Sequence, residues 1–144
     1  MSNEKIKSTD IENKLYIALT SIGRSTIENN SEQSLLDLMT AVESLVEEKN
    51  FSQNLTDQIC ERCAELLGKD SKSKLSIYKE MKVLYNKRSE IIHGSKQSKI
   101  TISDLRYLRE ISSKLCTLFI NNIEKFKTII DWNKYFLELR FKQN

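Results

Sequence analysis

The chain contains no proline and only three glycines in 144 residues. These two residue types most often end helices and form the tight turns of hairpins and sandwiches. Their scarcity leaves long segments in which a helical period can run without interruption. A chain of this length has room for one hydrophobic core rather than two. The sequence therefore predicts a single all-α domain, a helical bundle of about five helices over residues 1–144.

Apolar residues recur at helical spacing in five segments. We expect helices over about 10–29, from Asn30 to about 50, from Ser52 or Asn54 to Gly68, from about 75 to Gly94, and from Ser103 to about 126. Gly68 suits a left-handed cap at a helix C-terminus, and the segment "KDSKSK" after it is expected to form a loop. The pair Asn121-Asn122 is a candidate break in the fifth helix.

The tail "YFLELRFK" fits two patterns. Its apolar residues alternate as in a strand, and they also fit one face of a helix. Helix is favoured, because a lone strand has no partner for its backbone polar groups.

Charge and hydropathy restrict the class of protein. Nine basic and three acidic residues lie between Lys69 and Lys99, whereas the remainder carries 14 basic and 17 acidic residues. This local excess is weak evidence for a polyanionic partner, since solvated lysine faces are common. The polar N-terminal segment and the lack of a long apolar run predict neither a signal peptide nor a membrane span, so a cytoplasmic location is expected.

The three cysteines are an odd number, and Cys60 and Cys63 form a C-x-x-C on one helix face. A zinc site needs four ligands, and beyond this pair the chain offers only Cys116 and His93, which do not form a second matching pair. Reduced, partly buried thiols are therefore predicted, with no metal.

The segment "YNKRSEIIHG" places an arginine and the only histidine at the end of an apolar helical pattern. At about 100° per residue, Arg88 falls in the middle of the stripe formed by Ile77, Met81 and Leu84. A guanidinium does not lose its charge and is rarely buried alone. Arg88 must therefore pair with an acid, reach the surface or bind an anion.

His93 lies about 140° round the helix from Arg88, in the last turn before Gly94. The helix dipole there favours the imidazolium, which can donate a proton near neutral pH. A site shared with Arg88 needs the length of the arginine, a distorted last turn or a second copy of the chain. The structural alternative is a histidine that hydrogen-bonds the end of its own helix, beside an arginine in an internal ion pair.

The segment "LYNKRSEIIHG" resembles the signature of the Apea-like branch of the HEPN domains, in which an Arg and, a few residues later, a His end one helix of a small bundle. Upstream, "SLLDLMTAVESLVEE" is similar to that branch's helix with an apolar run followed by Ala-(Leu/Val)-Glu-x-Leu. "CERCAELLG" fits the helix between these two. The resemblance covers about residues 33–125, with the segments in the same order.

This resemblance implies an RNA-cleaving or RNA-binding domain that dimerises, with the Arg-His motifs of two copies facing each other. Active members are metal-independent endoribonucleases of antiviral abortive infection, toxin–antitoxin pairs and CRISPR effectors. Carried over to this sequence, Arg88 and His93 are the catalytic pair, Ser89 fills a position that is often polar, and Glu43 is the acid that holds Arg88. No cofactor is implied. The implied partners are RNA, a second copy of the chain and an antitoxin or other defence-complex subunit.

Three further residues are candidates for RNA contacts. Lys87 and Lys96 could bind phosphates, although solvated lysines are common. Tyr85 could stack on a base, but its position beside the apolar stripe favours the core. Glu43 lies at the edge of its own stripe, where exposure to solvent competes evenly with pairing to Arg88.

The predicted function is therefore a metal-independent HEPN-type endoribonuclease with a site shared by a homodimer. RNA cleavage through the 2′-hydroxyl needs a base, an acid for the departing 5′-oxygen and positive charge near the phosphorane. Two facing chains would supply two histidines and two arginines. The alternatives are a non-catalytic RNA-binding or protein-interaction module, in which Arg88 and Glu43 form a structural ion pair, and a neutralising or regulatory subunit of a defence complex.

Overall fold

The computed structural model describes residues 10–47, 54–94, 99–125 and 129–141. They form six helices: α1 (Asp10–Ile27), α2 (Ser31–Val46), α3 (Leu55–Leu67), α4 (Ser71–Ile92), α5 (Ile102–Asn121) and α6 (Ile129–Phe141). Within these ranges there is no strand. The all-α prediction is confirmed, and the tail for which helix was favoured over strand is α6.

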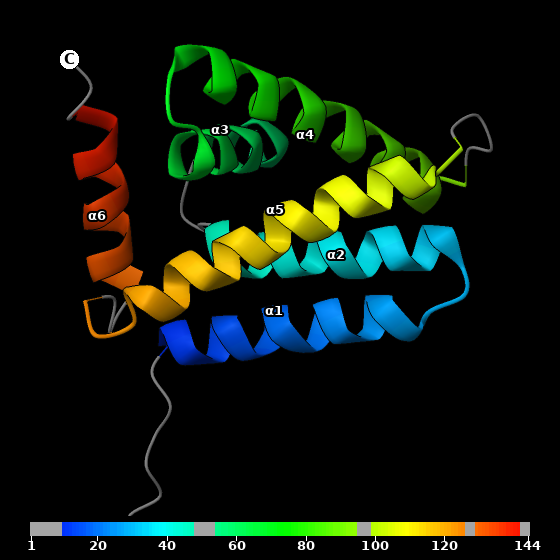
Figure 1. Ribbon diagram of the computed structural model, residues 1–144, viewed down its shortest axis with the longest axis horizontal. Coiled ribbons are helices and arrows are strands. Elements are labelled where there is room, and N and C mark those ends of the chain that lie inside the picture. The colour runs from blue at the N-terminus through cyan, green and yellow to red at the C-terminus, as the bar shows by residue number, and fades with distance from the viewer. Residues whose placement is uncertain (1–9, 48–53, 95–98, 126–128, 142–144) are drawn as a thin grey trace, which may run out of the picture.

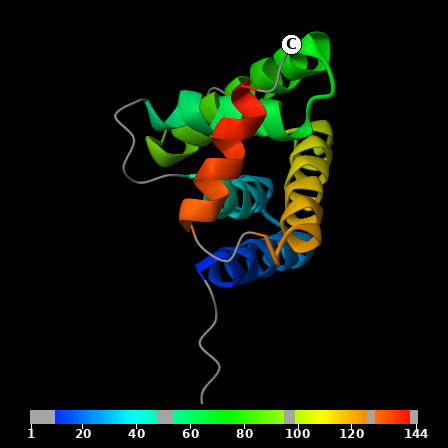
Figure 2. The same cartoon turned by 90° about the vertical axis from the view of Figure 1, so that its left-hand side faces the viewer.

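The helices are arranged as two hairpins crossed by α5 (Figure 1). A short loop joins α1 to α2, which run antiparallel, and α3 and α4 form the second hairpin. Helix α5 runs diagonally across the bundle and contacts α1, α2 and α3. Helix α6 lies across one end, where it packs on α3 (Figure 2).

Helix α2 forms the centre of the bundle, since it contacts α1, α3, α4 and α5. Six of its apolar residues recur at helical spacing and are fully buried: Leu35, Leu38, Met39, Val42, Leu45 and Val46. Burial of side chains of this size contributes about 1.5 to 3 kcal/mol each relative to exposure, so this helix organises the core. Its N-terminus was predicted correctly, because the side chain of Asn30 accepts a hydrogen bond from the backbone N–H of Gln33.

The connection between α3 and α4 is shorter than predicted. Residues 71–74 of the expected loop belong to α4, because Asp70 caps the helix and it begins at Ser71. A capping box stabilises this start, in which Asp70 accepts from the backbone N–H of Ser73 and the Ser73 hydroxyl accepts in return.

Gly68 was also expected to be left-handed, but its φ is −76°. Space is the reason for glycine here: a Cβ would lie 2.7 Å from the carbonyl oxygen of Ala64 and 2.9 Å from the Cα of Lys74. The left-handed glycine is Gly94, with a φ of 72°, directly after α4.

The apolar stripe expected for α4 also includes Ile91 and Ile92 in its last turn. Met81 and Leu84 are buried as expected, whereas Ile92 is 55% exposed. Helix α5 ends at Asn121, where the asparagine pair indicated a break.

The cysteines were expected to be partly buried thiols, and Cys60, Cys63 and Cys116 are free thiols in the core. Burial raises the pKa of Cys60 and of Cys116 to about 11, so both stay protonated and unreactive at neutral pH.

Candidate functional site

Arg88 points from α4 toward α2, where it pairs with Glu43, the acid that the resemblance implied. Its Nε lies 3.1 Å from Oε1 of Glu43. The guanidinium also lies over the ring of Tyr85, 5.6 Å from the ring centroid. The side chain of Arg88 remains 30% exposed and that of Glu43 18% exposed. The charge in the apolar stripe is thus balanced by a partner on another helix.

Tyr85 completes this cluster from inside the core. Its hydroxyl donates a hydrogen bond of 2.6 Å to the same Glu43 oxygen that Arg88 contacts. Burial raises the pKa of Tyr85 far above its usual range, and the negative charge of Glu43 raises it further, so the hydroxyl remains a donor. The residue is only 4% exposed. Its assignment as an RNA-binding residue is therefore corrected: a buried ring offers no face to a base.

His93 lies in a different environment, at the C-terminal cap of α4. Its backbone N–H donates to the carbonyl oxygen of Ser89 at 3.0 Å, and its side chain is exposed. The positive φ of Gly94 ends the helix directly after it. Arg88 and His93 therefore leave α4 in different directions, as the helical spacing predicts, and one copy of the chain does not bring them to a common point.

A shallow groove of about 350 Å³ opens beside His93, lined by Asn86, Ser89, Glu90 and His93. The four positions follow a spacing of three, four and seven residues from Asn86, so they lie on one face of α4. Ser89, proposed as the polar residue after the arginine, belongs to this groove rather than to the Arg88 cluster. The predicted site is thus divided into an ordered cluster around Arg88 and an open groove around His93.

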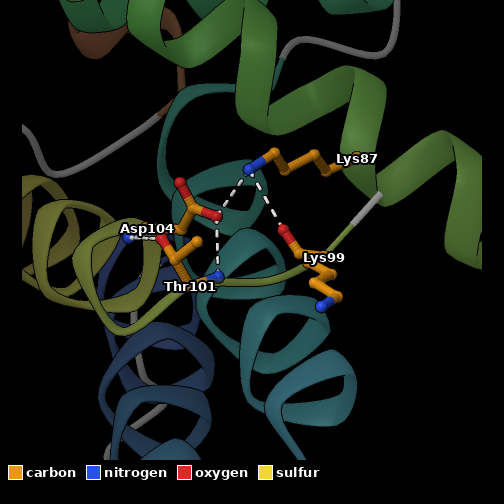
Figure 3. A network of polar contacts seen from close by, with 4 residues as sticks. All are labelled: Lys87, Lys99, Thr101 and Asp104. Carbon is orange, nitrogen blue, oxygen red and sulfur yellow. Dashed lines mark hydrogen bonds and ion pairs between the residues drawn. The ribbon is translucent and has the colours of Figure 1, made fainter. Parts of the chain in front are cut away.

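Lys87 has a structural environment that the sequence did not reveal (Figure 3). Its ammonium group donates to Oδ2 of Asp104 at 2.7 Å and to the carbonyl oxygen of Lys99 at 3.2 Å. Asp104 belongs to the capping box of α5 and also accepts from the backbone N–H of Thr101. Lys87 thereby fastens the end of α4 to the start of α5. A phosphate that bound Lys87 would have to compete with these acceptors.

The positive charge of α4 is largely used inside the molecule. Three of the six cations of this helix pair with acids on three other helices: Lys82 with Asp57 on α3, Lys87 with Asp104 on α5, and Arg88 with Glu43 on α2. The excess of basic residues in this part of the sequence therefore produces a weaker positive field at the surface. Lys96, the remaining candidate for RNA, lies outside the described residues.

Asn86 and Glu90 were missed by the sequence reasoning. The helical period could have identified them, because Ser89 and Glu90 follow Asn86 by three and four residues and so lie on the same face of the helix. Among the residues that the structure describes, no group of three or more His, Cys, Asp or Glu side chains is placed to hold a metal ion. None of the described helices is both long enough and apolar enough to cross a membrane.

Comparisons with known proteins do not add a family to these observations. No model of a known protein family matches the chain, and neither the curated proteins nor the solved structures contain a significant match. The class defined by the fold is a single all-α bundle with a polar groove at the end of its fourth helix.

Proposed function

We propose that this protein is a metal-independent endoribonuclease of the HEPN type, cytoplasmic and part of a defence or toxin system, with a site shared by two copies of the chain. The observation that carries the proposal is the division of the motif. Arg88 is oriented by Glu43, whereas His93 is exposed in a polar groove less than two turns away. A fixed cation and a free imidazole are the two groups that this reaction needs.

The chemistry assigns a role to each group. One His93 takes the proton of the ribose 2′-hydroxyl, and that oxygen attacks the adjacent phosphorus. The His93 of the second copy gives a proton to the 5′-oxygen as its bond to phosphorus breaks. The products are a 2′,3′-cyclic phosphate and a free 5′-hydroxyl. Arg88 stabilises the charge on the phosphorane through its terminal amino groups, because its ion pair with Glu43 uses Nε.

The exposed face of α4 supports contact between two copies. Val83 is 54% exposed and lies one turn before Asn86, so an apolar side chain precedes the groove residues along α4. A second copy packed on this face would bury Val83 and bring a second His93 close to the first. Polar groove residues beside an apolar contact are a common arrangement in interfaces.

Cleavage of RNA in excess chelator tests the proposal. The wild-type protein should cut RNA, and His93→Ala should lose about 100-fold or more in rate while its circular dichroism spectrum is unchanged. Arg88→Lys keeps the charge but not the forked donors, so a large loss in this variant supports phosphate binding. Equal cleavage by wild type and His93→Ala contradicts the catalytic assignment.

A mixing experiment tests the shared site. When wild type is mixed with an equal amount of His93→Ala and the subunits exchange, about one dimer in four contains two intact chains. Activity should then fall to about a quarter per total protein. A fall to one half means that each copy acts alone, which contradicts the shared site. A monomeric mass in light scattering also contradicts it.

A non-catalytic module is the second candidate, and one observation favours it. The positive charge of Arg88 is already balanced by Glu43, and both contact Tyr85, as in a structural ion pair. RNA that is bound but not cut, with equal affinity in His93→Ala, supports this candidate.

A further inference from the structure

Glu90 lines the groove beside His93, and the reaction proposed above gives it no role. Its Oε2 is buried from solvent and has no hydrogen-bond partner among the described residues. Buried polar atoms in folded proteins are nearly always paired, and an unpaired carboxylate oxygen carries a larger cost than a neutral group. A donor is therefore expected to bind this oxygen in the working protein.

The neighbouring cations on α4 are engaged elsewhere. Lys87, three residues before Glu90, is bound to Asp104 and to the carbonyl oxygen of Lys99. Arg88 is turned toward Glu43. Of the described residues that line the groove, His93 alone can carry a positive charge.

Position and freedom of movement both make His93 a suitable donor. It follows Glu90 by three residues, and side chains at this spacing are neighbours on a helix surface. Its ring is exposed and makes no hydrogen bond to a residue that the structure describes. The i,i+3 spacing therefore places the ring of His93 within reach of the Glu90 carboxylate.

We propose that Glu90 is a positioning residue for His93: its carboxylate accepts a hydrogen bond from one ring nitrogen and so directs the other nitrogen into the groove. A carboxylate in this place fixes the tautomer of the imidazole and stabilises the imidazolium formed during proton transfer. The contact itself does not depend on the reaction, whereas its effect on the rate rests on the proposed function.

Nuclear magnetic resonance tests the contact directly, because His93 is the only histidine of the chain. The ¹⁵N signals of its ring report which nitrogen carries the proton and whether it is hydrogen-bonded. Glu90→Ala should shift both ring signals, and Glu90→Gln, which keeps an acceptor, should shift them less. Glu80→Ala is the matched control, since Glu80 is an exposed acid on the same helix outside the groove. Ring signals that are the same in wild type and Glu90→Ala overturn the proposal.

Kinetics test the consequence separately. Glu90→Ala should lower kcat about 10-fold or more with little change in KM, and Glu90→Gln should recover part of the loss. If wild type cuts RNA and Glu90→Ala is equally fast, the positioning role fails while the proposed function stands. If wild type does not cut RNA, the proposed function fails, and the ring signals still decide whether Glu90 holds His93.

Discussion

Arg88 lies against α2 with a carboxylate and an aromatic ring in contact, whereas His93 stands at the exposed end of α4. Only four residues lie between them along the chain, yet Arg88 alone is part of the packing between helices. The arginine is held by groups from two helices, and the histidine by its own backbone alone. The same motif therefore contains one residue whose position the fold fixes and one whose position a ligand or partner can set.

This difference determines how variants of the motif should be interpreted. A substitution at Arg88 removes a charge that the α2–α4 contact uses, so its effect on activity includes an effect on folding. A substitution at His93 removes a side chain that supports no described contact. Stability measurements on variants of the Arg88 cluster and of His93 can therefore test whether the two differ in this way, without any assay of function.

The largest effect on stability is expected for Glu43→Ala. The variant leaves the Tyr85 hydroxyl buried without an acceptor and Arg88 without its counter-ion. We expect a loss of about 2 kcal/mol in the free energy of unfolding, less than for a fully buried pair because Arg88 is partly exposed. Urea denaturation measures it. Glu110→Ala is the control, since its pair with Lys114 is 58% exposed on both sides and should matter little. Similar losses in both variants would mean that Glu43 contributes no more to stability than an exposed acid.

Tyr85→Phe isolates one hydrogen bond of the same cluster. The ring stays in the core, and only the donor to Glu43 is lost. A loss of about 1 kcal/mol is expected. Because the bond cannot exist without its acceptor, Tyr85→Phe should cost less when Glu43→Ala is already present, and this coupling is measured by a double-mutant cycle. Additive losses would mean that the hydroxyl acts independently of Glu43.

The cluster and the groove also differ in how far the sequence predicts them. A charge in an apolar stripe predicts that Arg88 needs an acid, because that rule is local to one helix. The identity of Glu43 depends on how α2 packs on α4, and the family resemblance rather than any spacing supplied it. The groove residues Asn86 and Glu90 share a face that the helical period gives directly, but nothing in the sequence shows that this face is hollowed.

In the fold, too, local features were predictable from the sequence, whereas contacts between distant segments were not. Helix ends defined by one capping residue, such as Asn30, follow from the sequence. The start of α4 was missed because Asp70 and Ser73 cap the helix from within a segment whose composition is typical of a loop. The bond between Lys87 and Asp104 joins distant parts of the chain, and such contacts depend on the packing of whole helices.

Asp104 gives a smaller, pH-dependent effect at the end of α4. Partial burial alone would raise the pKa of this carboxyl, but hydrogen bonds from Lys87 and the backbone of Thr101 outweigh it, and the pKa lies below its ordinary value of 3.8. Such a group contributes stability above its ordinary pKa and loses it as the pH falls through the lower folded value. Asp104→Asn should therefore cost about 1 kcal/mol near neutral pH and much less near pH 3. Urea midpoints at both pH values measure it, and an equal cost at both would contradict this account.

The smallest effect is expected for His93→Ala, and it is the most informative one. Since the side chain is exposed and its one proposed contact is the hydrogen bond to Glu90, the free energy of unfolding should fall by less than about 1 kcal/mol. A loss comparable with that of Glu43→Ala would place His93 in the packing of the bundle. The motif would then be a structural element at both ends, and the exposed imidazole could no longer be regarded as a group available for chemistry. A small change in stability combined with lost RNA cleavage assigns His93 to the reaction rather than to the packing of the bundle.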